Sequence, residues 1–310
     1  MPTGATPRHL RASASLTPTI HDRHAMLQKT SDYATLIRSF RWEVPPEYNI
    51  GVDVCDRWAD ADPERLALIE VGENGYGPQT RISYGKLRDL SNRFANALHA
   101  LGLGPSDTGT GAGDRVAILL TQRHETAVAH IAAFKAGCVS LPLFTLFGPD
   151  ALLHRLRDSG ARVLVTDRAS LSGLAGIRAD LPALEHIFLV DGLPDPGAPG
   201  AGLVGLRDFT AALNAAAPDF MPVATRADTP AVLIYTSGTT GAPKGALHGH
   251  RMLTGHLPGV EISHDFLGQA GDCLWTPADW AWIGGLFDVL LPALHHGIAV
   301  VACRFDKFTP

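Results

Sequence analysis

A ten-residue segment rich in glycine and hydroxyl side chains, residues 236–245 (TSGTTGAPKG), is the part of the sequence best suited to chemistry. Glycine permits positive φ angles and close backbone approach, so successive N–H groups can face one concavity and bind an anion. The hydroxyl groups can donate to phosphate oxygens, and Lys244 adds a compact positive charge. The segment follows an apolar, strand-like run at residues 231–235. These features predict a loop that holds a polyphosphate.

The order of residues in this segment separates it from other nucleotide loops. A Walker A loop has glycine directly before its lysine and serine or threonine directly after it. Here Pro243 precedes Lys244 and Gly245 follows it, which argues against a P-loop kinase or GTPase. Ser237 lacks the Gly-x-Ser-x-Gly context of a hydrolase nucleophile. A turn that merely connects two strands is the alternative without function, and ten positions in this order argue against it.

The segment resembles the signature phosphate loop of the adenylate-forming superfamily, which includes acyl-CoA synthetases, adenylation domains of peptide synthetases and luciferases. Residues 40–59, 113–120 and 276–286 are similar to short- and medium-chain acyl-CoA synthetases of the acetyl-CoA synthetase type, so the resemblance spans roughly residues 35–310. It implies that a carboxylate attacks the α-phosphate of ATP with Mg²⁺, and that CoA then displaces AMP from the acyl-AMP.

The resemblance also implies roles for individual residues. Lys244 corresponds to a catalytic residue that stabilises charge on the leaving pyrophosphate. No metal-ligand residue is identified in the sequence. The residues that correspond to ATP-phosphate contacts are Thr236, Ser237, Gly238, Thr239, Thr240, Gly241 and Lys244.

A second segment, residues 279–285 (DWAWIGG), resembles the stretch that lines the acyl pocket in these relatives. It is similar to a Gly-Trp-Val-Thr-Gly stretch of acetate-using members. Trp282 of this chain matches the Trp of that stretch, Ile283 matches the Val, and Gly284 matches the Thr. Glycine in place of threonine removes a side chain from that wall, so the hypothesis is an acyl group larger than acetate, from propionate to medium chain. The alternative is that Trp280 and Trp282 are core aromatics.

Alternating periodicities predict the elements that position these segments. Apolar residues at helical spacing from Leu87 to Leu101 indicate a helix that ends at Gly102, and residues 124–136 and 149–158 indicate two more, which end at Gly137 and Gly160. Buried strands are predicted at residues 115–120, 138–143, 162–166, 186–190 and 298–303, and a hairpin at residues 66–71 and 79–84.

Strands separated by such helices predict an α/β fold of mostly parallel sheets with helices on both faces. The resemblance identifies it as the large N-terminal domain of the adenylate-forming fold, with the C-terminal lid domain absent. Gly109, Gly111 and Gly113 follow a helix and precede a strand, which is the wrong context for a dinucleotide fingerprint, so a loop is predicted there.

The composition of the sequence argues against several classes of binding partner. The 310 residues carry a formal net charge of −5, so the basic surface typical of nucleic-acid or anionic-membrane binding is not expected. The sequence contains no run of about 18 apolar residues, so a transmembrane helix is not expected. The four cysteines are widely spaced, which favours a reducing, cytoplasmic setting over disulfides or zinc. His248 and His250 form an HxH pair with too few neighbouring ligands for a metal site. The expected partners are small molecules: a carboxylic acid, ATP and CoA.

The two ends of the sequence carry their own expectations. Residues 1–25 are basic and contain several serine and threonine residues, which predicts a disordered or over-extended N-terminus with Met26 as the start, a transit peptide being the alternative. Residues 26–310 are expected to be a truncated AMP-binding N-terminal domain, because the family's later motifs and lid do not occur. Little acyl-CoA synthesis is therefore expected without a complementing C-terminal polypeptide. The open alternatives are an adenylation domain, an aryl-acid ligase, or a non-catalytic ATP-binding remnant.

Overall fold

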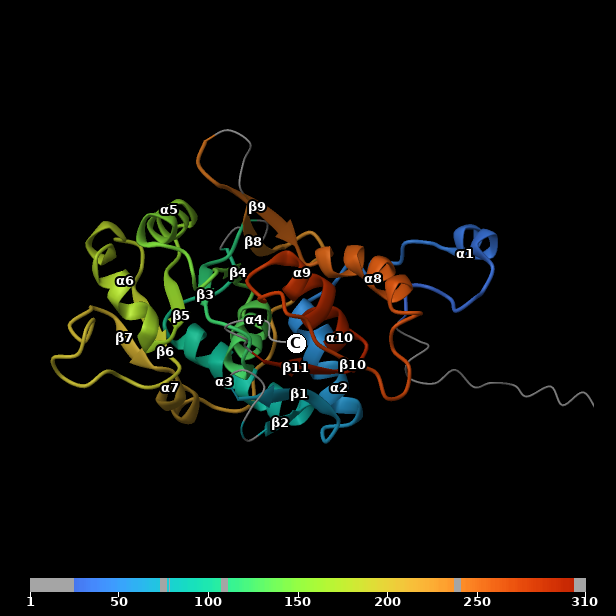
Figure 1. The fold of residues 1–310 in the computed structure, drawn as a ribbon, viewed down its shortest axis with the longest axis horizontal. Coiled ribbons are helices and arrows are strands. Elements are labelled where there is room, and N and C mark those ends of the chain that lie inside the picture. The colour runs from blue at the N-terminus through green and yellow to red at the C-terminus, as the bar shows by residue number, and fades with distance from the viewer. Residues whose placement is uncertain (1–24, 73–76, 78, 107–110, 237–240, 304–310) are drawn as a thin grey trace, which may run out of the picture.

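A computed structural model describes residues 25–72, 77, 79–106, 111–236 and 241–303, and Figure 1 shows their arrangement. The strands form two sheets. The larger has seven strands in the order β7-β6-β5-β3-β4-β8-β9, and every neighbouring pair is parallel except β8 and β9. Its strands are β3 (Arg115–Leu119), β4 (Val139–Pro142), β5 (Val163–Thr166), β6 (His186–Leu189), β7 (Leu206–Asp208), β8 (Pro230–Thr236) and β9 (Lys244–Gly249).

The smaller sheet joins segments from both ends of the described chain, in the order β10-β11-β1-β2. The predicted hairpin is confirmed, because β1 and β2 pair antiparallel. The other side of β1 pairs in parallel with β11, whose far side pairs in parallel with β10. These strands are β1 (Leu66–Val71), β2 (Gln79–Ser83), β10 (Cys273–Leu274) and β11 (Ala299–Ala302).

Helices cover both faces of the larger sheet, as predicted. The three helix ends assigned to glycine are confirmed: Gly102, Gly137 and Gly160 follow α3, α4 and α5, and each has a positive φ, between 60° and 72°. The α-helices of the described residues are α1 (Tyr33–Ser39), α2 (Arg57–Ala61), α3 (Tyr84–Ala100), α4 (His124–Lys135), α5 (Pro149–Ser159), α6 (Leu171–Ala175), α7 (Phe209–Ala215), α8 (Met252–Ser263), α9 (Ile283–Gly285) and α10 (Leu291–His295). Within the described part of the chain, no helix is long and apolar enough to cross a membrane.

Two hydrophobic cores lie on opposite faces of the larger sheet. In β3, Val116 and Ile118 belong to the core that contains α3, α4, α8 and α10, while Ala117 and Leu119 belong to the core that contains α5 and α6. This alternation is what a strand buried on both faces requires. The first core also includes side chains of β1 and β11, so it joins the two sheets into one body.

A buried lysine is the most unusual polar group of this first core. Lys135, at the end of α4, has a side chain that is 0% exposed. Its Nζ donates to a carboxylate oxygen of Asp56, and also to Ser91 Oγ at 2.9 Å and Asn92 Oδ1 at 2.9 Å. Three acceptors match the three N–H donors of an ammonium group. The charge is therefore compensated within the core.

Two buried histidines make stability depend on pH. Burial lowers the pKa of His130 to about 3 and the pKa of His250 to about 4. Both stay neutral in the folded protein at a pH where the unfolded chain, with a histidine pKa near ~6.5, binds protons. Their contribution to the free energy of unfolding is thus fully present above about pH 6.5. It is lost as the pH falls through the folded-state pKa values, about 4 for His250 and about 3 for His130.

We expect the free energy of unfolding to fall over that window by roughly 1 kcal/mol per pH unit for each histidine. Urea titrations at pH 7.5, 6.0 and 5.0 measure this slope. The His130→Gln variant should show a shallower slope than the parent protein. Equal slopes in parent and variant would contradict the assignment of the acid sensitivity to His130.

Candidate functional site

The carboxyl edge of the larger sheet contains a point where neighbouring loops diverge. Strands β3 and β4 are adjacent and parallel, but α4 and α5, which follow them, pack against opposite faces of the sheet. The loops after the two strands therefore turn away from each other, and such a switch point leaves a crevice in which α/β proteins bind ligands.

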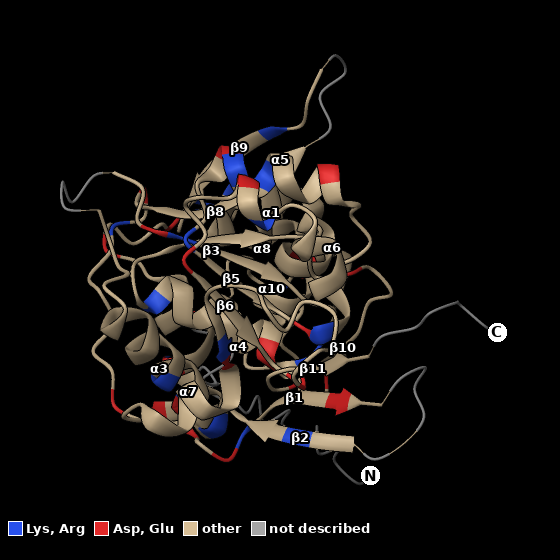
Figure 2. Cartoon of the chain, turned by 90° about the vertical axis from the view of Figure 1, so that its left-hand side faces the viewer, with Lys and Arg blue, Asp and Glu red and all other residues tan. Residues whose placement is uncertain are grey.

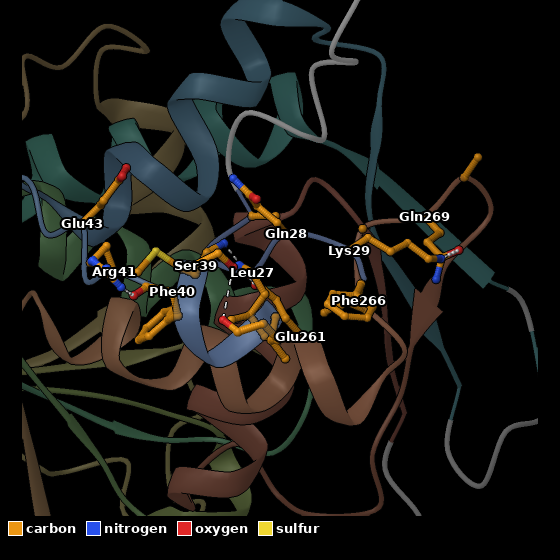
Figure 3. A pocket seen from close by; sticks show the side chains of 16 residues that line it. Leu27, Gln28, Lys29, Ser39, Phe40, Arg41, Glu43, Glu261, Phe266 and Gln269 are labelled. Atoms are coloured by element: carbon orange, nitrogen blue, oxygen red, sulfur yellow. Dashed lines mark hydrogen bonds between the residues drawn. The ribbon is translucent and has the colours of Figure 1, made fainter. Parts of the chain in front are cut away.

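A cavity of about 690 Å³ lies elsewhere, between residues 25–43 and residues 261–270 at and after the end of α8 (Figure 3). Its buried acid, Glu261, accepts hydrogen bonds from the backbone N–H of Met26 at 2.9 Å and of Leu27 at 2.7 Å. His296 Nε2 lies 3.1 Å from the same carboxylate. Glu261 thus attaches the segment before α1 to α8, and both of its carboxylate oxygens already accept hydrogen bonds.

The crevice at the switch point holds a cavity of about 470 Å³, a size typical of small-molecule sites. Its lining comes from the segments that follow β3, β4, β10 and β11, so the carboxyl ends of parallel strands from both sheets meet there. The lining residues are Thr121, Gln122, Phe144, Thr145, Leu146, Pro277, Ala278, Asp279, Trp282 and Cys303.

Three aromatic rings form one wall of this region. Trp282 lies with its ring centroid 5.3 Å from that of Phe144 and 6.0 Å from that of Phe147, and the two phenylalanines are 5.8 Å apart. Trp282 is 44% exposed, whereas Trp280 is fully buried in the core. The two tryptophans of the predicted segment thus lie in different environments, and only Trp282 lines the cavity.

The other predicted pocket residues, Ile283 and Gly284, follow in α9 and are not among the lining residues. Ile283 is 40% exposed. Their role in acyl selection stays a prediction. Phe144 and Gln122 were not identified from the sequence, although both follow a predicted strand, and that position is a usable signal because α/β sites form at carboxyl ends of strands.

Gln122 fixes the loop that carries Trp282. Its Nε2 donates to the carbonyl oxygens of Thr276 at 3.0 Å and Ala278 at 2.6 Å, and its Oε1 accepts from the N–H of Cys303 at 3.4 Å. One side chain after β3 thereby joins the segments after β10 and β11. The wall of the cavity is held against the larger sheet by this amide.

The same loop closes tightly at Gly285. A Cβ atom at this position would lie 2.3 Å from the carbonyl oxygen of Asp279, which real contacts do not allow. At Gly284 the nearest atom to such a Cβ is Asp288 Oδ2, at an ordinary 3.7 Å. Adjacent glycines therefore differ in what they tolerate.

We expect Gly285→Ala to lower the free energy of unfolding by about 1–3 kcal/mol, as overpacking does. Gly284→Ala is the matched control and should change it by less than about 1 kcal/mol, because a helical alanine is favoured and has room. Urea unfolding of both variants measures the difference. Equal effects at the two positions would contradict the close packing at Gly285.

The predicted phosphate loop lies between β8 and β9, which pair as a hairpin, and β9 forms one edge of the larger sheet (Figure 1). Thr236, the last residue of β8, pairs with Lys244, the first residue of β9. Gly241 has a φ of +99°, which favours glycine. Lys244 is exposed. Ser237, Gly238, Thr239 and Thr240 lie outside the described residues.

Helix α5 supports both ends of this hairpin, and basic residues of α5 and β9 lie at one end of the molecule (Figure 2). His154 Nε2 lies 2.8 Å from the carbonyl oxygen of Pro243, and Tyr235 donates its hydroxyl to Asp158 Oδ2 at 2.5 Å. Burial, together with the Asp158 charge, raises the pKa of Tyr235 well above its usual value, so the hydroxyl stays a donor. A Cβ at Gly245 would lie 2.9 Å from Leu233 Cδ1, so the backbone of β9 at this position is in close contact with a side chain of the neighbouring strand β8.

The histidine pair and the glycine string of the sequence include residues with structural roles. His250 Nδ1 accepts from the N–H of Ile50 at 3.1 Å inside the core, which is a structural role. A Cβ at Gly113 would lie 2.2 Å from the carbonyl oxygen of Gly137, so this glycine serves packing in a loop before β3.

One group of potential metal ligands occurs among the described residues, formed by Glu70, His124 and Glu125. His124 Nδ1 lies 2.5 Å from Glu70 Oε2, and Arg123 pairs with both carboxylate oxygens of Glu125 at 2.7 and 2.9 Å. Arg123 thus compensates the charge of Glu125, and both Glu70 and Glu125 already have side-chain partners.

Known proteins match this chain in sequence and in fold. The family model of AMP-binding enzymes matches residues 55–310. Acetyl-coenzyme A synthetases of Syntrophobacter fumaroxidans and Magnetococcus marinus are 31% and 30% identical, over 84% and 83% of this chain. The chain spans about 40% of the length of these curated relatives.

Solved structures agree with this assignment. An acyl-CoA synthetase of Brucella canis matches with a TM-score of 0.69 and 27% identity, covering 90% of this chain and 47% of that one. An anthranilate CoA ligase in complex with anthranoyl-AMP has the same fold, with a TM-score of 0.69 and 22% identity over 84% of this chain and 45% of that one. The family match covers most of the sequence, including the phosphate-loop hairpin and the cavity, and the chain therefore belongs to the AMP-binding enzyme family.

Proposed function

We propose that this chain is the ATP- and acid-binding part of an AMP-forming acyl-CoA synthetase. The observation that supports this most directly is the placement of two features at one sheet edge. The phosphate-loop hairpin leaves β8 at Thr236, and the cavity walled by Phe144 and Trp282 opens after the neighbouring strand β4. A carboxylic acid in that cavity would lie next to the phosphates of ATP on the hairpin.

The residues of the hairpin suit this reaction. The Lys244 ammonium, with the hydroxyl groups and backbone N–H groups of residues 236–241, would hold the phosphates and stabilise the charge that develops on leaving pyrophosphate. Lys244 makes no ion pair with any described carboxylate, and its side chain is exposed. Mg²⁺ would neutralise further phosphate charge. Thr236, Gly241 and Lys244 are the described members of this proposed set.

The acid is proposed to be larger than acetate. A cavity of about 470 Å³ with an aromatic wall offers apolar surface to an alkyl chain, and Gly284 lacks the side chain of the acetate-using pattern. The wall of Phe144 and Trp282 also suits an aromatic ring, and one structural neighbour is an anthranilate CoA ligase. An aryl acid is therefore the second candidate substrate.

CoA is the proposed acceptor in the second half-reaction. The chain spans about 40% of the length of its curated relatives, and we propose that a complementing C-terminal polypeptide contributes to this second half-reaction. All four cysteines are free thiols, which supports the proposed cytoplasmic setting.

The test is carboxylate-dependent ATP–pyrophosphate exchange with acids from acetate to octanoate and with benzoate, accompanied by calorimetric titration of ATP. We expect ATP binding, and exchange that peaks at an acid longer than acetate. A peak at acetate would contradict the proposed acid, and a peak at benzoate would select the aryl alternative. A folded protein that neither binds ATP nor catalyses exchange would refute the proposed function, and ATP binding without exchange would favour a non-catalytic ATP-binding protein.

A further inference from the structure

Arg155, on α5, is a buried cation beside the phosphate-loop hairpin. It is 7% exposed, its Nη1 donates to the carbonyl oxygen of Ala151 at 2.8 Å, and its Nε has no hydrogen-bond partner in the described structure. No described carboxylate forms an ion pair with it, and burial lowers the pKa of Arg155. A buried charge without a carboxylate needs another source of stabilisation.

Two aromatic rings supply that stabilisation. The Arg155 guanidinium lies 4.0 Å from the ring centroid of Phe147 and 5.8 Å from that of Tyr235. Both distances fall within the range of cation–π interactions, which strengthen when the cation is desolvated. The planar guanidinium suits such stacking better than an ammonium does.

The two rings belong to different parts of the site. Phe147 contacts Trp282 and Phe144, which line the cavity. Tyr235 immediately precedes Thr236, and a Cβ at Gly245 would lie 3.2 Å from Tyr235 Cζ, so this ring supports the strand that begins at Lys244. Arg155 therefore lies between the cavity wall and the hairpin.

We propose that Arg155 is a positioning residue that couples the aromatic wall of the cavity to the phosphate-loop hairpin. The coupling rests on the proposed function for its ligands: an acid that changes the packing of Trp282 and Phe147 would also change the packing of β8 and β9 through Arg155 and Tyr235. Such coupling is reciprocal, so the acid raises the affinity for ATP by the same factor as ATP raises that for the acid.

The variants are Arg155→Met, which keeps the apolar stem and removes the stacking cation, and Arg155→Lys, which keeps the charge without the planar group. Arg157→Met is the matched control, because Arg157 lies on the same helix with a side chain 58% exposed. Circular dichroism and melting temperature establish that each variant is folded. If Arg155→Met fails to fold, Arg155→Lys replaces it in every comparison.

The first measurement needs no ligand. Hydrogen exchange of the hairpin amides is compared in the parent, in Trp282→Ala, in Arg155→Met and in the double variant. We expect Trp282→Ala to accelerate hairpin exchange by about 5-fold or more in the parent and to have no further effect when Arg155 is replaced. Additive effects, or Arg155→Met behaving like Arg157→Met, would overturn the proposal.

The second measurement is the ATP dissociation constant with and without saturating octanoate. We expect octanoate to tighten ATP binding by at least ~5-fold in the parent and in Arg157→Met, by less in Arg155→Lys, and not at all in Arg155→Met. An unchanged octanoate effect in Arg155→Met overturns the proposal. If the parent binds no ATP while hairpin exchange still depends jointly on Trp282 and Arg155, the proposed function fails and the coupling stands.

Discussion

Lys244→Ala is expected to lower the rate of carboxylate-dependent ATP–pyrophosphate exchange by about 100- to 1,000-fold, the scale of losing one preorganised group that faces developing charge. Lys244 begins β9 directly opposite Thr236, so the strand register places this residue at the base of the proposed phosphate loop. Its exposure leaves the charge available to a ligand. The measurement is the exchange rate with the best acid of the panel, together with the ATP dissociation constant.

Lys86→Ala is the matched control for this variant. Lys86 is an exposed lysine of α3 that pairs with Asp89, and its loss should leave exchange unchanged within about 2-fold. Lys244→Arg should retain part of the activity, because it keeps the charge but changes its shape. Equal exchange rates in Lys244→Ala and Lys86→Ala would remove Lys244 from the proposed catalytic role.

Lys135→Met is expected to lower the free energy of unfolding by about 3–5 kcal/mol, the scale of removing one partner from a buried ion pair. The variant leaves the Asp56 carboxylate without its cation, and Ser91 and Asn92 without a donor. Denaturant unfolding measures the loss. The exposed lysine Lys86 again provides the comparison, since Lys86→Met should cost less than about 1 kcal/mol.

A double variant separates the charge from the packing. Replacing Asp56 as well, in Lys135→Met/Asp56→Leu, removes the uncompensated carboxylate and should recover part of the lost stability. A double variant as unstable as Lys135→Met would contradict the view that an unpaired Asp56 causes the loss. A loss below 1 kcal/mol in Lys135→Met alone would mean that the pair contributes little.

Local patterns predicted the helices α3, α4 and α5 and five of the seven strands of the larger sheet, β3, β4, β5, β6 and β8. The ends of α3, α4 and α5 were predicted because glycine at positions 102, 137 and 160 adopts a left-handed conformation whose preference is local. The parallel partner of β1 could not be predicted in the same way. Its parallel neighbour β11 is far away in the sequence, and apolar strands of similar length do not specify which of them pair.

Some residues of the candidate site were likewise predicted from local patterns, and others were not. The glycine-rich loop and Trp282 were predicted because their residue types form a recognisable pattern. Gln122 and Arg155 were missed because a single glutamine after a strand, or an arginine on an amphipathic helix, is ordinary in sequence. Their importance arises only from contacts with distant carbonyls and rings.

The pairing of β1 with β11 also bears on how the protein forms during translation. The parallel register joins residues separated by 232 positions, as does the hydrogen bond from Arg65 Nε to the carbonyl oxygen of Gly297. At roughly 5–20 residues per second, a ribosome needs about 10–50 s to synthesise that interval. Throughout this time the β1–β2 hairpin has an unpaired apolar edge, a known template for misassembly. During synthesis, β1 should therefore need protection by chaperones more than the locally connected strands of the larger sheet do.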